Sequence, residues 1–68
     1  MQQIGTVKTF NAVRGWGFIE AESGCDFFFY QGDILMAGFR TVEPGTPVEF
    51  SEGRDESGRL RAVNVRPF

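Results

Sequence analysis

Hydrophobic and polar residues alternate along most of the chain in short stretches, which are separated by turn-forming residues. Alternation with a period of two is typical of strands with one buried face, and frequent turn signals are typical of all-β domains. The stretch 31–45 lacks a sustained helical period and is predicted to be a long loop, with one helical turn near Asp33–Met36. The predicted strands are Ile4–Asn11, Arg14–Glu20, Asp26–Tyr30, Thr46–Glu52 and Leu60–Val65.

The connections between these strands predict how the sheet is arranged. Ala12-Val13 would join a first hairpin, Glu22-Ser23-Gly24 is a turn cluster, and Gly53–Gly58 is a charged, flexible connection. Five short antiparallel strands expose their edges unless the sheet closes on itself. We therefore expect an all-β protein with a five-stranded antiparallel barrel.

Side chains of a strand alternate between its two faces, so each strand predicts an inner and an outer row. In the second strand the row with Trp16 and Phe18 also carries Arg14 and Glu20, so this row is assigned to the outside. The same reasoning places Phe28 and Tyr30 outside on the third strand, and Phe10 outside beside Lys8 on the first. The predicted core consists of Val7, Ile19, Phe27, Phe29, Ile34, Val48, Phe50, Val63 and Val65.

The outer face thus holds more aromatic rings than a monomer ordinarily exposes to water. Rings that alternate with Lys8 and Arg14 fit a stacking platform for single-stranded nucleic acid, in which bases lie on rings and phosphates meet cations. The alternative is that the rings form cross-strand pairs that only stabilise the sheet, or that the long loop covers them.

Length and composition limit the other possibilities. A chain of 68 residues is expected to form one domain, residues 1–68. With no histidine and one cysteine, the chain lacks the ligand set of a zinc site and the usual proton shuttle, so we expect no enzymatic activity, metal or cofactor. The absence of a membrane span or signal pattern predicts a cytoplasmic protein. The net charge of −2 argues against purely electrostatic binding of nucleic acid.

Three motifs resemble the cold-shock protein family, which includes the bacterial cold-shock proteins and the cold-shock domains of Y-box proteins. GTVKTFN (5–11) is similar to the family's first-strand motif, and RGWGFI (14–19) and DFFFYQ (26–31) are similar to its two RNA-binding motifs, in the same order and spacing. The resemblance implies an OB-fold barrel that binds single-stranded RNA and DNA and acts as an RNA chaperone. A monomer is expected, with a strand-exchanged dimer as the alternative.

The resemblance also implies which residues contact nucleic acid. Trp16 is a larger ring than the family's Phe or Tyr, Arg14 replaces Lys, Tyr30 replaces His, and Gln31 matches the Y-box form. No contacts are assigned to Arg54, Arg59 and Arg61, which are interpreted as solvated loop charge; the alternative is that they supplement the cationic rim of the site. The predicted contact residues are Lys8, Phe10, Asn11, Arg14, Trp16, Phe18, Phe28, Tyr30, Gln31, Phe39 and Arg40.

The main departure from the family is Thr9, which stands where the family has a stacking tryptophan. Loss of one ring is expected to weaken binding by roughly tenfold or more, since base stacking contributes about 1–3 kcal/mol. Thr9 and the acidic composition therefore keep a second hypothesis open, in which the barrel binds a protein and its nucleic-acid binding is weakened.

Overall fold

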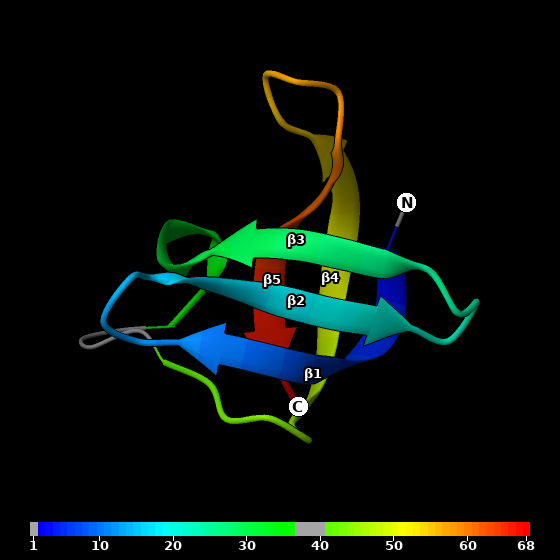
Figure 1. Ribbon diagram of the computed structural model, residues 1–68. Helices are drawn as coiled ribbons and strands as arrows, with labels where there is room; N and C mark the ends of the chain where they lie inside the picture. Colours follow the sequence, from blue (N-terminus) through cyan, green and yellow to red (C-terminus); the bar gives the residue numbers. More distant parts are fainter. Residues whose placement is uncertain (1, 37–40) are drawn as a thin grey trace.

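The computed structural model describes residues 2–36 and 41–68, and Figure 1 shows that their strands form a closed barrel. Around the barrel the strands follow the order β1-β2-β3-β5-β4. The predicted all-β barrel is therefore confirmed. None of the helical structure within the described ranges is long and apolar enough to cross a membrane. The elements are β1 (Gln2–Asn11), β2 (Trp16–Ala21), β3 (Asp26–Tyr30), the 3-10 helix η1 (Gln31–Asp33), β4 (Pro47–Arg54) and β5 (Leu60–Pro67).

One strand pair differs from the predicted antiparallel arrangement. β1, β2 and β3 form an antiparallel meander, and β4 pairs antiparallel with both β1 and β5. β3 and β5 close the barrel as a parallel pair, with Phe28 opposite Arg61. A closed ring with an odd number of strands cannot be antiparallel throughout, so one parallel contact is required once the barrel closes.

The helical turn after β3 forms earlier than the predicted Asp33–Met36. The 3-10 helix spans Gln31–Asp33, and the Asp33 carboxylate accepts a hydrogen bond of 2.9 Å from the backbone N–H of Tyr30. This bond satisfies a backbone donor at the start of the turn, as a capping side chain does in a longer helix. The turn therefore closes directly at the end of β3.

The core contains eight of the nine predicted residues, and the exception is Val63. Ala62 is fully buried instead, and Val63 is only half-buried, where it faces Gly53 on β4. The cause is a bulge in β5: between the Glu49–Arg66 and Ser51–Val63 pairs, β5 uses one residue more than β4. Asn64 lies there with a φ of 53°, the left-handed conformation that asparagine tolerates better than most residues.

A second bulge, in β1, overturns the predicted orientation of Phe10. Val7 pairs with Ile19 and Thr9 pairs with Phe18, so Lys8 is an extra residue that shifts the alternation by one. Phe10 therefore turns back to the barrel interior, where its ring stacks on the buried ring of Phe29 with centroids 5.5 Å apart.

Candidate nucleic-acid interface

Four aromatic side chains gather on the outer face of β2 and β3. Trp16 lies opposite Tyr30 in the strand register, and Phe18 lies opposite Phe28. Residues directly opposite in an antiparallel pair point to the same face, so these four rings are neighbours. We call Trp16, Phe18, Phe28 and Tyr30 the ring cluster.

The rings of this cluster contact one another closely. Phe28 is in the centre: its centroid lies 5.6 Å from those of both Trp16 and Phe18, and 4.6 Å from that of Tyr30. Trp16 stacks on Phe28 at an interplanar angle of 29°, and Phe18 and Tyr30 meet it edge to face. The rings therefore form cross-strand pairs, as predicted by the alternative in which they only stabilise the sheet. Pairing does not hide the whole cluster, however, because Tyr30 is 40% exposed and Trp16 and Phe18 are half-buried.

Phe28 differs from the other three rings because it is only 7% exposed. Its neighbours include the guanidinium of Arg59, whose central carbon lies 4.2 Å from the ring centroid. Arg61 occupies a similar position 4.9 Å above the ring of Tyr30. Both distances are within the range of cation–π interactions. Arg59 and Arg61 therefore contact the ring cluster, which favours the alternative that they belong to a cationic rim over the interpretation as solvated loop charge alone.

Arg61 is held by a carboxylate at the end of β3. It forms two hydrogen bonds with Asp33, from Nε to Oδ2 at 3.0 Å and from Nη2 to Oδ1 at 2.8 Å. Asp33 is 8% exposed, and this paired geometry raises the pKa of Arg61 above its ordinary value, chiefly through the hydrogen bond. The pair fixes β5 against η1 and orients Arg61 over Tyr30.

Lys8, at the bulge of β1, lies beside an acidic partner on β3. Its Nζ is 3.0 Å from Oδ2 of Asp26, and both side chains are about half exposed. The hydrogen bond with Asp26 and the charge of that carboxylate raise the pKa of Lys8. A phosphate near Lys8 would therefore compete with Asp26 for the same ammonium group.

The other predicted contact residues divide by position. The Asn11 side chain accepts 3.0 Å hydrogen bonds from the backbone N–H groups of Val13 and Arg14, so it shapes the β1–β2 turn. Arg14 is exposed on that turn. The backbone N–H of Gln31 donates to the carbonyl of Gly15, which brings Gln31 to the same end of the cluster. Phe39 and Arg40 lie outside the described residues.

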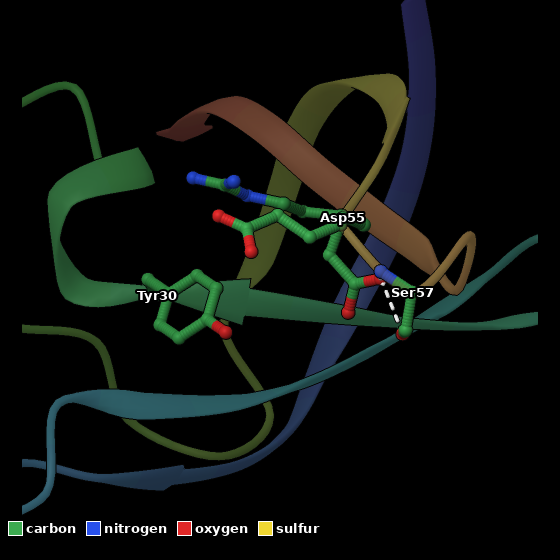
Figure 2. A pocket seen from close by; sticks show the side chains of 5 residues that line it. Tyr30, Asp55 and Ser57 are labelled. Carbon is green, nitrogen blue, oxygen red and sulfur yellow. Dashed lines mark hydrogen bonds between the residues drawn. The ribbon is translucent and has the colours of Figure 1, made fainter.

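The connection from β4 to β5 extends past the edge of β3 (Figure 1) and adds a pocket beside the ring cluster. Figure 2 shows Tyr30 of β3 on one side of this pocket and Asp55 and Ser57 of the connection on the other. Glu56 and Arg61 complete its lining. The prediction of a merely flexible connection missed this pocket.

An ordered turn builds this connection. Oδ1 of Asp55 accepts hydrogen bonds from the backbone N–H groups of Ser57 and Arg59 and from the Ser57 hydroxyl. These donors stabilise the charged carboxylate and lower the pKa of Asp55 to about 2. The sequence carried a signal for it, since an aspartate three residues before a glycine is typical of such turns.

A small closed β-barrel with an aromatic surface on two neighbouring strands is typical of OB-type nucleic-acid-binding proteins. Comparison with known proteins identifies the family within this class: residues 3–68 match the 'cold-shock' DNA-binding domain. The chain therefore belongs to the cold-shock domain family, whose members bind nucleic acids and are not enzymes.

Relatives from several bacteria agree with this assignment. The chain is 46% identical to cold shock protein 1 of Lactiplantibacillus plantarum, over 93% of this chain and 94% of that protein. It is 48% identical to cold shock-like protein CspA of Stigmatella aurantiaca, over 91% of each. A solved structure, drosophila Unr CSD456, superposes with a TM-score of 0.80 at 26% identity; it is matched along the whole of this chain, which spans 27% of that chain.

Proposed function

We propose that this protein binds single-stranded RNA and DNA by stacking bases on the ring cluster. The observation that supports this most directly is that Trp16, Phe18 and Tyr30 keep accessible surface while packed around one central ring. Stacking on such rings is tolerant of sequence, because every base has a π-face. Cations at Lys8, Arg14 and Arg61 surround the rings and suit a phosphate backbone.

Binding of about six or seven nucleotides would disfavour RNA secondary structure by mass action, because only the unpaired strand is bound. We therefore propose an RNA-chaperone role for a monomeric, cytoplasmic protein whose residues 1–68 form a single domain. On β1 we propose Lys8 and Asn11 as contact residues and leave Phe10 out, because its ring packs against the core.

Titration with a seven-nucleotide pyrimidine DNA and its RNA counterpart tests the proposal, with the fluorescence of Trp16, the chain's one tryptophan, as the signal. We expect saturable quenching that weakens with salt. Phe18→Ala should reduce affinity by roughly fivefold or more while the barrel stays folded. Leu35→Ala is the matched control, because Leu35 is 47% exposed and does not belong to the ring cluster. Unchanged affinity of Phe18→Ala would contradict the proposal.

The second candidate, a barrel that binds a protein, is favoured by one observation: Lys8 and Arg61 are already paired with carboxylates. Salt dependence separates the two candidates. Each phosphate contact on a single strand should give a slope of about −0.7 in log affinity against log salt. Failure of wild-type protein to bind either oligonucleotide at tens of micromolar, with the fold intact, would favour the protein-binding candidate.

A further inference from the structure

The central ring of the cluster is covered by a side chain of the protein itself. Phe28 belongs to the outer face of β3, yet it is 7% exposed, and the guanidinium carbon of Arg59 lies 4.2 Å from its centroid. A base cannot stack on that side of Phe28 while Arg59 is there. The site must therefore bind a base in some other way at this position, or move Arg59 first.

Arg59 is fixed in its position by the turn that precedes it. Its Nε donates to Oδ2 of Asp55 at 3.0 Å, and its backbone N–H donates to Oδ1 of the same carboxylate at 2.9 Å. The backbone N–H of Asp55 donates in turn to the carbonyl of Arg59 at 3.0 Å. Gly58 allows this tight closure with a φ of 86°. The guanidinium therefore has an orientation set by Phe28 beneath it and Asp55 at its edge.

The side of Arg59 away from Phe28 remains open. The Arg59 side chain is 53% exposed, although it contacts both a ring and a carboxylate. Arg61 repeats the arrangement two residues later over Tyr30, but its side chain is only 32% exposed, and two hydrogen bonds commit it to Asp33. Compared with Arg61, Arg59 thus offers the larger accessible surface.

Two modes of binding at this position can be compared by what each one breaks. A base that stacks directly on Phe28 must displace Arg59, which removes a cation–π contact and a hydrogen bond to Asp55. A base that stacks on the open side of the guanidinium keeps both contacts and adds a third. Guanidinium planes are established stacking partners for bases, and an ammonium group cannot replace them in that role.

We propose that Arg59 is a binding residue of this site and that its guanidinium presents a stacking surface for one base. This inference rests on the proposed function. The ligand is a nucleobase of a single strand, held on the side of the Arg59 guanidinium that faces away from Phe28. The planar guanidinium of Arg59, which the turn at Asp55 holds in position, thereby extends the ring cluster.

Arg59→Lys and Arg59→Ala test this assignment, measured by fluorescence anisotropy of a labelled heptanucleotide over a range of salt. Arg59→Lys keeps the charge and removes the plane, so we expect roughly a fivefold or greater loss of affinity with an unchanged salt slope. Arg59→Ala should lose at least as much. Arg66→Lys is the matched control: Arg66 is 50% exposed and is also ion-paired, with Glu49 on β4. Its affinity should equal that of the wild type.

Three results would overturn the inference, provided that thermal unfolding shows the variants to be folded. If Arg59→Lys binds with wild-type affinity while Arg59→Ala binds more weakly, Arg59 only supplies charge. Equal or tighter binding by Arg59→Ala would mean that Arg59 is a cover that must leave Phe28. Absence of binding by the wild type would refute the proposed function and this inference together, whereas the first two results would leave the proposed function standing.

Discussion

Restoring a ring at position 9 should strengthen binding, because the bulge of β1 presents this residue to the ring cluster. Thr9 is exposed and lies directly opposite Phe18 in the strand register. Side chains of such a pair share one face, with Cβ atoms about 4.5–5.5 Å apart. A tryptophan at this position would therefore enlarge the cluster beside Phe18 on the side of β1.

The size of the effect follows from one added stacking partner. A base on a ring contributes about 1–3 kcal/mol, which corresponds to roughly 5- to 150-fold in affinity. The free energy of unfolding should rise only slightly, since a cross-strand aromatic pair with Phe18 contributes about 0.2–1 kcal/mol. We therefore expect Thr9→Trp to bind a heptanucleotide at least about fivefold more tightly, with little change in thermal stability.

Fluorescence anisotropy of a labelled oligonucleotide is the suitable assay, because a second tryptophan would complicate the emission of Trp16. Thr6→Trp is the matched control: Thr6 is exposed on the same strand but lies opposite Glu20 instead of a ring. It should leave affinity unchanged. Equal affinities of Thr9→Trp and wild type, or equal gains in both variants, would refute the claim that position 9 belongs to the binding surface.

Three further predictions concern the scaffold of the site. Gly17→Ala should lower the free energy of unfolding by about 2 kcal/mol in denaturant titration, because the added Cβ would meet the backbone of β1, including the carbonyl oxygen of Thr9. Gly32→Ala should change the free energy of unfolding little, because its Cβ would meet no atom of the described residues within 4 Å. Equal losses in both variants would contradict this account. Asp33→Ala should lower the free energy of unfolding by about 2–3 kcal/mol, since the variant loses the two hydrogen bonds from Arg61 and the one from the Tyr30 N–H. An unaltered unfolding midpoint would count against this prediction. The pKa of Asp55 is lowered from 3.8 to about 2, so its contribution to stability is complete above about pH 4 and is lost as the pH falls through 2. The amide proton signal of Arg59 should follow this titration in NMR spectra. A midpoint near pH 4 would disprove the claim that the turn lowers the pKa of Asp55.

The alternation of residues predicts most of this barrel, because inner and outer faces repeat with a period of two wherever strands are regular. It fails where the period is interrupted. The extra residue Lys8 in β1 turns Phe10 inward. The bulge at the left-handed Asn64 in β5 places Ala62, instead of the predicted Val63, in the core. Neither bulge has a strong local signal, since each depends on the register that the neighbouring strand adopts after the barrel closes.

The residues of the candidate site are likewise predictable from the sequence only where the strands are regular. The rings of β2 and β3 could be assigned to one face from local alternation alone, because both strands are regular and adjacent in the chain. Arg59 and Arg61 could not, since their places depend on the parallel contact between β3 and β5, strands that are thirty residues apart. Arg59, directly before β5, and Arg61, within β5, lie over Phe28 and Tyr30 only once that register exists.

The pairing of cations with carboxylates has a consequence for how the site recognises its ligand. Lys8, Arg59 and Arg61 lie by the ring cluster, and each is bonded to an aspartate: Asp26, Asp55 and Asp33, respectively. Together with a net charge of −2, this arrangement provides little long-range attraction for a polyanion. The carboxylates instead orient the cations, two of them over rings. Stacking should therefore contribute more to affinity than phosphate contacts do, so the salt slope should correspond to fewer contacts than there are cations around the rings.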